Sequence, residues 1–118
     1  MTNAGFEAAL EDRNELELTT TGRVSGNKTS RTVWFTQRDG NLYLVPVTGS
    51  DSQWFKNVVQ KPALQLAADG AEHSATATPV TDPGTVARVV DDFRDKYGAQ
   101  YVADYYPNPN VAVEVPLG

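Results

Sequence analysis

The sequence predicts a mainly β fold: a small closed or partly open antiparallel β-barrel of about six strands with accessory helices. Two observations predict the strands. Alternating apolar and polar runs flank Asp39-Gly40, and similar runs flank Asp69-Gly70. Asp-Gly pairs favour the tight turns of β-hairpins. The third observation is that most of these runs are joined by hairpins, which requires antiparallel pairing because parallel strands need crossover connections.

The first part of the chain is expected to hold a short helix or arm, a strand and a hairpin. Residues 6–12 suggest the short helix. Residues 15–21 alternate leucine with polar neighbours, the two-residue period of a half-buried strand. Residues 31–47 then form the first hairpin, with its turn at Asp39-Gly40.

A short helix is expected between the two hairpins, over residues 50–62. Ser50 and Gln53 stand at capping-box spacing, apolar residues recur one turn apart, and Pro62 stops the helix. The second hairpin, residues 63–80, follows directly.

The clearest helix is expected over residues 81–98. Asp82 can cap it, Pro83 suits the first turn, and Gly98 ends it. One apolar stripe runs along this helix and consists of Val86, Val89, Val90, Phe93 and Tyr97. Residues 111–115 alternate valine with other residues and predict the last strand.

Size and composition predict one domain spanning residues 1–118. The chain has 118 residues and a formal net charge of -5, which argues against a nucleic-acid binder that works by bulk electrostatics. No stretch approaches the roughly 18 apolar residues of a membrane span, and the N-terminus lacks a signal pattern. We therefore expect a cytoplasmic protein without a membrane span.

Few side chains are available for conventional hydrolytic or metal chemistry. The sequence has no cysteine and a single histidine, His73. This excludes thiolate catalysis and leaves neither a Ser-His-Asp set nor a histidine-rich metal site within one chain. No metal site is expected, and His73 is interpreted as a packed or surface residue, with a ligand contact as the minority view.

A basic segment over residues 18–38 is the most unusual feature of this acidic chain. It contains no acid and carries four cations: Arg23, Lys28, Arg31 and Arg38. Gly22 and Gly26 permit close backbone approach, and hydroxyl groups add donors, so the pattern suits a phosphate. The alternative is a solvated loop whose charges balance acids elsewhere. A P-loop is rejected, because Asn27 replaces its second glycine and a strand follows where a helix should begin.

Aromatic residues form a second group of candidates. Trp34 and Tyr43 lie on opposite arms of the first hairpin, and Trp54 begins the helix after it. Residues so placed usually pack in the core, and less often wall a flat, conjugated ligand. Nearer the C-terminus, a pocket rim is plausible for Tyr101, Tyr105 and Tyr106.

Three segments together resemble the flavin- and deazaflavin-binding split-barrel superfamily. They are TTTGRVSGNKTSRTVWF, RDGNLYLVPVTGS and SQWFKNVVQKPALQL. Within the superfamily, they are most similar to the small deazaflavin-dependent nitroreductase-like reductases, over roughly residues 18–66. The resemblance implies a six-stranded antiparallel split β-barrel of the FMN-binding type. It also implies coenzyme F420 or FMN as cofactor, and such barrels often form homodimers.

The resemblance further implies which residues would contact the cofactor and substrate. The phosphate-bearing tail would meet Arg23, Ser25, Gly26 and Lys28, and Arg31 stands two positions beyond the family's usual arginine. The ring would lie along the strand backbone at Thr32, Val33 and Trp34. The pocket would be shaped by Thr48, Gly49, Trp54 and Asn57. The substrate side would be bordered by Tyr101, Tyr105 and Tyr106, with Tyr105 as the candidate hydrogen-bond donor to the acceptor.

These implications favour an oxidoreductase that passes a hydride to a small electrophile such as a quinone, an enone or a nitroaromatic. The sequence inventory agrees, because a deazaflavin or flavin carries the hydride itself and the protein supplies positioning. Two alternatives stay open. One is a split barrel that binds a flavin, haem or other planar ligand without turnover. The other is a structural homodimer without a cofactor.

Overall fold

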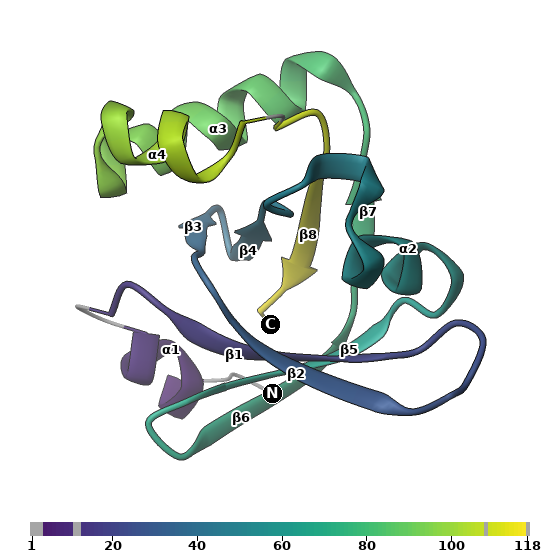
Figure 1. The fold of residues 1–118 in the computed structure, drawn as a ribbon. Helices are drawn as coiled ribbons and strands as arrows, with labels where there is room; N and C mark the ends of the chain where they lie inside the picture. The colour runs from purple at the N-terminus through teal and green to yellow at the C-terminus, as the bar shows by residue number, and fades with distance from the viewer. Residues whose placement is uncertain (1–3, 11–12, 108, 118) are drawn as a thin grey trace.

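Two four-stranded antiparallel sheets and a layer of helices make up the protein, shown as a computed structural model in Figure 1. The structure describes residues 4–10, 13–107 and 109–117. The first sheet has the order β2-β1-β5-β6. Its strands are β1 (Leu16–Thr21), β2 (Lys28–Val33), β5 (Ala63–Ala68) and β6 (Ala71–Thr76). The second sheet has the order β3-β4-β8-β7. Its strands are β3 (Thr36–Arg38), β4 (Asn41–Leu44), β7 (Thr78–Val80) and β8 (Ala112–Pro116).

The mainly β, antiparallel class is confirmed, but the expectation of six strands in a barrel is wrong in its count. The described residues form eight strands, and no ladder among them joins the two sheets into a closed barrel. The difference arises where the chain passes from one sheet to the other. Residues 31–38 read as one strand, yet β2 pairs with β1 and β3 pairs with β4. Residues 71–80 divide in the same way, at Ala77, into β6 and β7.

The helices fall close to the predicted segments. They are α1 (Ala4–Leu10), the 3-10 turn η1 (Gly49–Asp51), α2 (Gln53–Gln60), α3 (Pro83–Tyr97) and α4 (Ala99–Tyr105). The expected short helix at residues 6–12 corresponds to α1, and residues 11 and 12 lie outside the described residues. Asp82 caps α3 by accepting the Thr85 N–H, Pro83 begins the helix and Gly98 ends it, as predicted.

The capping box predicted for the helix after the first hairpin is wrong. Ser50 lies in η1, and α2 begins after Ser52, whose side chain makes no cap hydrogen bond. The reason is that Ser50 has another partner. Its N–H donates to the Asn110 side-chain oxygen (3.0 Å), and its hydroxyl accepts from the Asn110 amide (2.9 Å). These two bonds join η1 to the segment that leads into β8.

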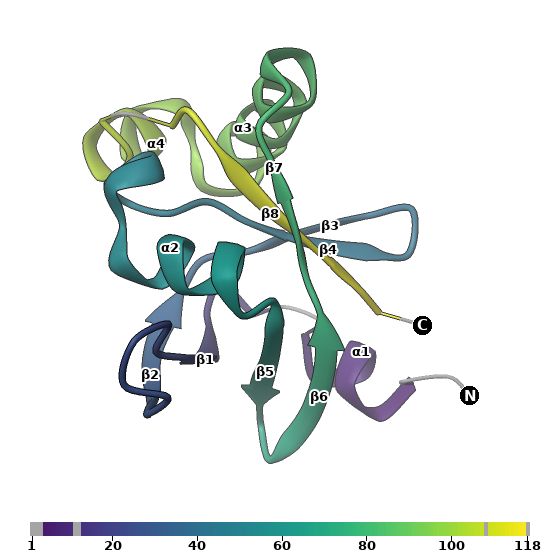
Figure 2. The same ribbon diagram turned by 90° about the vertical axis from the view of Figure 1, so that its right-hand side faces the viewer.

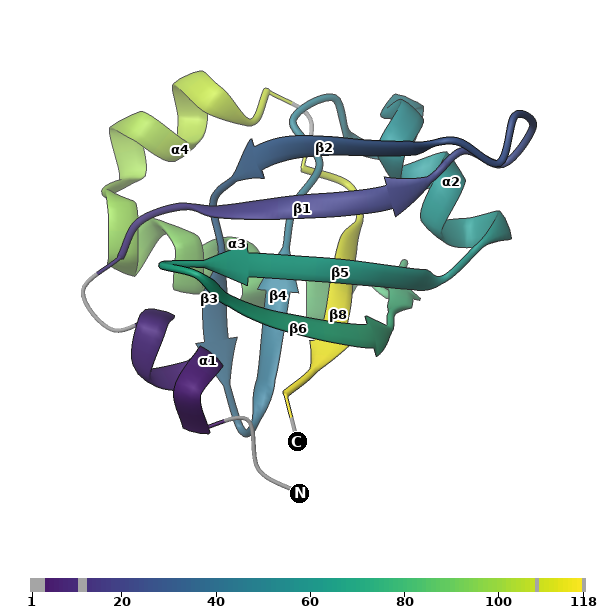
Figure 3. The ribbon, with the colours of Figure 1, turned by 90° about the horizontal axis from the view of Figure 1, so that it is seen from below.

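Figures 1 and 2 show three layers: the first sheet, the second sheet, and the pair α3 and α4. The main core lies between the sheets and receives leucines and valines from both, together with Trp54, Phe55 and Val58 of α2. A second core lies between the second sheet and the helices α3 and α4. β4 and the residue that follows it contact both cores: Leu42 and Leu44 face the first, and Tyr43 and Val45 face the second. In the view from below, the outer face of the first sheet carries no covering layer (Figure 3).

Among the described residues, no helix combines the length and the apolar character that a membrane crossing requires.

Candidate functional site

One cleft is lined both by residues predicted to contact the cofactor and by tyrosines predicted to border the substrate, and we call it the aromatic cleft. It encloses about 310 Å³. It is lined by Arg31, Thr32, Val33, Trp34, Val45, Val47, Thr48, Ser52, Gln53, Trp54, Tyr105 and Tyr106. These residues come from the end of β2, the segment after β4, the start of α2 and the end of α4, which lie on the left side of Figure 2. The expected cofactor contacts at Thr32, Val33, Trp34, Thr48 and Trp54 are thus placed at one site.

Trp34 is held in a stack of aromatic rings. It lies parallel to Tyr97, with ring centroids 4.3 Å apart and planes 13° apart. Tyr105 meets Trp34 edge-on at 4.4 Å, and Tyr106 does so at 5.9 Å. Phe93 of α3 packs against both Tyr97 and Tyr106. Such offset and edge-to-face contacts stabilise a ring beyond simple burial, so Trp34 has one well-defined orientation.

The hydroxyl of Tyr97 fixes the backbone next to Trp34. Its single proton is shared between the carbonyl oxygens of Asn14 (2.7 Å) and Phe35 (2.9 Å), and its oxygen accepts the Phe35 N–H (3.0 Å). Burial raises the pKa of Tyr97 to about 12. Tyr97 therefore stays protonated at neutral pH and ties α3 to the crossing between β2 and β3.

The three C-terminal tyrosines occupy different positions. Tyr106 is buried, and burial raises its pKa well above the ordinary range, so it forms a wall of the cleft. Tyr105 is 38% exposed and lies at the rim. Tyr101 is 69% exposed and does not line the cleft. The spacing of four between Tyr101 and Tyr105 does place both on α4, but only Tyr105 and Tyr106 reach the site.

The strand register separates the basic residues of β2. Arg31 pairs with Leu18, a buried residue, whereas Lys28 pairs with Thr21 on the other face of β1. Since paired residues share a face, Arg31 lies on the inner face of the sheet with Leu18, and Lys28 lies on the outer face with Thr21. Lys28 accordingly lines a separate depression with Thr19 and Thr21. Lys28 therefore does not line the aromatic cleft.

Arg23 lies next to the cleft but is engaged by α2. Its backbone N–H and its guanidinium both donate to the Asn57 side-chain oxygen, at 3.1 and 2.8 Å. The guanidinium also donates to the Gln53 side-chain oxygen at 2.9 Å. Gln53 lines the cleft, so Arg23 and Asn57 stand one side chain away from it. No carboxylate neutralises Arg23 among the described residues.

The glycine-rich loop between β1 and β2 is shaped by its own hydrogen bonds. The Gly22 N–H donates to Asn27 O, and the Ser25 hydroxyl accepts the Asn27 N–H. Gly26 has φ +76, and a Cβ there would lie 3.8 Å from the Lys61 ammonium. Ser25 and Gly26 thus form a turn beside Lys61 rather than part of the cleft lining.

The remaining candidates lie apart from the cleft lining. Gly49 is buried in η1, directly after Thr48. Arg38 forms an ion pair with Asp92 of α3. His73 is buried, stacks on Phe6 and lies 2.7 Å from Pro116 O through Nε2, as expected for a packed histidine. Of the four cations in the basic segment, only Arg31 lines the aromatic cleft.

Some lining residues were missed by the sequence analysis, namely Val45, Val47, Ser52 and Gln53. Lys61, near Gly26, was missed as well. Gln53 immediately precedes Trp54, so its place at the start of a helix beside a candidate aromatic residue was a usable signal. The valines carry no such signal, because alternating valines are typical of any strand end.

The sequence of residues 8–114 matches the family described as uncharacterized protein conserved in bacteria (DUF2255). No curated protein matches the sequence. Several solved structures are similar in fold. One is described as an F420-H2-dependent reductase (FDR-A): it is 18% identical with a TM-score of 0.68, and the match covers 87% of this chain and 94% of that one.

Two further structures show how varied the proteins with this fold are. The haem storage protein HutZ from Vibrio cholerae is 13% identical with a TM-score of 0.74, and the match covers 100% of this chain and 92% of that one. A chain described as a domain-swapped dimer is 20% identical with a TM-score of 0.67, and the match covers 88% of this chain and 81% of that one. At these identities the similarity shows a shared fold, the split-barrel fold that the sequence resemblance implied.

Proposed function

The chain belongs to the bacterial DUF2255 family, and from the chemistry of its aromatic cleft we propose that it is an oxidoreductase. The cofactor would be reduced coenzyme F420 or FMN, and the acceptor a small electrophile such as a quinone, an enone or a nitroaromatic. The observation that carries the proposal is the composition of the cleft. Rings of Trp34, Trp54 and Tyr106 wall it, and Arg31 is the one charged residue in its lining.

The residues present fit a flat ring with an anionic tail. Aromatic walls match a conjugated ring, and an unpaired arginine at the edge matches a phosphate. Arg31 is exposed and makes no ion pair among the described residues. The cleft volume of about 310 Å³ suits the ring, and the tail would extend past Arg31 toward Gln53 and Arg23. The lining contains no carboxylate that would repel the tail.

Each part of the chain then has a defined task. A bound deazaflavin or flavin supplies the hydride. Trp34 and the backbone from Thr32 orient the ring, and the stack behind Trp34 excludes water from one side. The Tyr105 hydroxyl, at the rim, is proposed to hydrogen-bond the acceptor oxygen as negative charge develops there. The turn formed by Ser25 and Gly26, next to Lys61, would meet the far end of the tail.

Cofactor titration of the purified protein tests this proposal, with matched variants on β2. Both tryptophans of the chain line the cleft, so their fluorescence should be quenched as F420 or FMN binds. Arg31→Ala is expected to weaken binding about 10- to 100-fold, because a charge-assisted bond contributes about 1–3 kcal/mol. Lys28→Ala, on the same strand but facing the outer surface, should leave the affinity unchanged. Equal losses in both variants, or no binding of either cofactor, would contradict the proposal.

The alternatives differ from an oxidoreductase in measurable ways. A planar-ligand binder would bind a flavin or haem but would not oxidise reduced cofactor in the presence of menadione. Haem binding is supported by the similar fold of the haem storage protein HutZ. However, His73 is the single histidine of this chain, and it lies in the core rather than at the cleft. We also propose a homodimer, supported by the similar chain described as a domain-swapped dimer. Light scattering that gives a monomer mass at all concentrations would reject it.

A further inference from the structure

Arg23 joins two residues of α2 at the edge of the aromatic cleft, and we call these three residues the Arg23 bridge. Gln53 and Asn57 lie one turn apart, so they share the face of α2 that meets the loop between β1 and β2. The Arg23 guanidinium donates to the Asn57 side-chain oxygen at 2.8 Å and to the Gln53 side-chain oxygen at 2.9 Å. Another side of α2 is buried in the main core, so the bridge is built on a fixed element.

The Arg23 bridge determines which way the side-chain amide of Gln53 points. A guanidinium has only N–H donors, so the arm of the Gln53 amide that meets Arg23 is its oxygen. The Nε2 group occupies the other arm and carries two N–H donors. It makes no hydrogen bond among the described residues, and Gln53 lines the aromatic cleft. The bridge therefore leaves the N–H groups of Gln53 as the unpaired part of this amide at the edge of the cleft.

Two other polar groups in the lining of the aromatic cleft are also free to donate. Ser52 is only 8% exposed, and its hydroxyl makes no hydrogen bond in the described part of the chain. The Arg31 guanidinium is a donor only, and it has no ionic partner in that part of the chain. A ligand oxygen can accept from all three side chains, whereas a ligand N–H group would face the donors of Gln53 and Arg31.

We propose that Gln53 donates through Nε2 to an oxygen of the anionic tail of the bound cofactor, and that Arg23 is a positioning residue that acts only through Gln53. This inference rests on the proposed oxidoreductase. It changes the task of Arg23, which the sequence resemblance placed in direct contact with the phosphate. Both terminal nitrogens of the guanidinium are already engaged by α2. A glutamine that is held before binding loses less freedom when the ligand arrives, so Arg23 raises affinity without touching the ligand.

The ordering of Gln53 can be measured without any cofactor, by nuclear magnetic resonance relaxation of the side-chain amides in the full chain. The Nε2 group of Gln53 should relax as a rigid group in the wild type and as a mobile group in Arg23→Met. Gln60 is the internal reference, because it ends α2, is exposed and makes no side-chain hydrogen bond among the described residues. Equal mobility of the two amides in the wild type, or an unchanged Gln53 amide in Arg23→Met, would overturn the positioning role.

Gln53→Glu separates the donor to the ligand from the contact with Arg23. Glutamate still offers Arg23 an oxygen, so the urea midpoint of unfolding should not fall. However, it has no N–H to donate, and it places a negative charge beside the anionic tail. Titration of this variant with F420 and FMN is therefore expected to give at least about tenfold weaker binding than the wild type. Wild-type affinity would show that Gln53 only supports the fold, and the inference would be wrong.

A double-mutant cycle distinguishes positioning from direct contact. Arg23→Met should weaken cofactor binding about tenfold in the wild type and cause no further loss in Gln53→Ala, because its effect passes through Gln53. Losses of equal size in both backgrounds would mean that Arg23 touches the tail, which would refute the inference and leave the proposed function in place.

Lys28→Met controls for the loss of one positive charge, because Lys28 lies on the outer face of the sheet. It should leave the affinity for F420 and FMN unchanged. A loss as large as that of Arg23→Met would indicate a bulk charge effect and contradict the inference. If the wild type binds neither cofactor, the proposed function fails, and the ligand assigned to Gln53 fails with it.

Discussion

Replacing Phe93 with alanine is expected to lower the free energy of unfolding by about 3–5 kcal/mol, the usual cost of removing a buried phenyl ring. Phe93 is fully buried between α3 and the second sheet. Its ring packs against Tyr97 and Tyr106, which in turn hold Trp34. The cavity would therefore open behind the wall of the aromatic cleft, where neighbouring rings are too rigid to fill it.

Urea unfolding followed by circular dichroism measures the effect of Phe93→Ala. Asp91→Ala is a suitable control, because Asp91 is an exposed residue of the same helix and most exposed substitutions change stability by less than about 0.5 kcal/mol. The tryptophan fluorescence of the folded Phe93 variant should also change, since Trp34 loses its support. A loss below about 1 kcal/mol would show that the helix layer repacks easily and does not hold Trp34 rigidly.

Replacing Tyr97 with phenylalanine is expected to cost about 1–3 kcal/mol, although only one oxygen atom is removed. The hydroxyl shares its proton between the carbonyl oxygens of Asn14 and Phe35 and accepts the N–H of Phe35. Its loss removes the acceptor of the partly buried Phe35 N–H and leaves Lys96 as the side-chain donor to Phe35 O. Tyr101→Phe is the matched control: Tyr101 is 69% exposed and its hydroxyl makes no hydrogen bond among the described residues, so stability should stay within about 0.5 kcal/mol. Equal effects of the two variants would contradict the role given to Tyr97.

The stability difference between the wild type and Tyr97→Phe should shrink at alkaline pH. The pKa of Tyr97 is about 12 in the folded protein and about 10 in an unfolded chain. Between these values the folded state binds more protons than the unfolded state, so the stability contributed by Tyr97 falls as pH rises. Urea unfolding at several pH values from about 9 to about 11 measures the difference. Lys96 and Tyr106 titrate in both proteins, so a difference that stays constant across this range would contradict the prediction.

Most of the elements could be predicted from the sequence, because each depends on local residues. The turns at Asp39-Gly40 and Asp69-Gly70 lie where expected, with positive φ at both residues of each pair. The cap at Asp82 and the end at Gly98 are equally local. The partners of the strands are not local. Residues 31–38 read as one β-rich run, and the three consecutive apolar residues Val33, Trp34 and Phe35 at the change of sheet were not recognised as a break.

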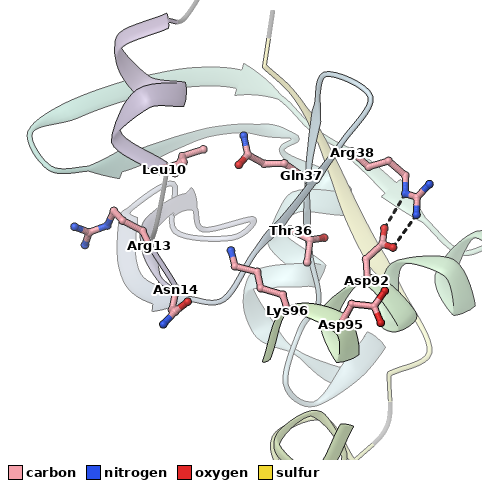
Figure 4. Close-up of a pocket in the computed structure, with 9 residues that line it drawn as sticks. All are labelled: Leu10, Arg13, Asn14, Thr36, Gln37, Arg38, Asp92, Asp95 and Lys96. Carbon is pink, nitrogen blue, oxygen red and sulfur yellow. Dashed lines mark hydrogen bonds and ion pairs between the residues drawn. The ribbon is translucent and has the colours of Figure 1, made fainter. Parts of the chain in front are cut away.

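The site was predictable only in part, for the same reason. Trp34, Trp54 and the tyrosines could be predicted as candidate site residues, because large aromatic side chains are few in this sequence. The basic segment was read as one group, yet Arg31 and Lys28 face opposite sides of β2, and Arg38 pairs with Asp92. Nearness in sequence did not indicate nearness in space. The depression drawn in Figure 4 was missed entirely, because its lining combines residues such as Leu10 and Asn14 with others from β3 and α3.

Lys96 and Tyr97 are neighbours on α3, and both donate to the carbonyl oxygen of Phe35. Lys96 lines the depression drawn in Figure 4, and Tyr97 stacks on Trp34, which lines the aromatic cleft. A ligand that drew Lys96 away from this oxygen would leave Tyr97 as its remaining side-chain donor, and the position of Trp34 would change with it. Two ligands bound on either side of this peptide group would therefore change each other's affinity, by the same factor in both directions.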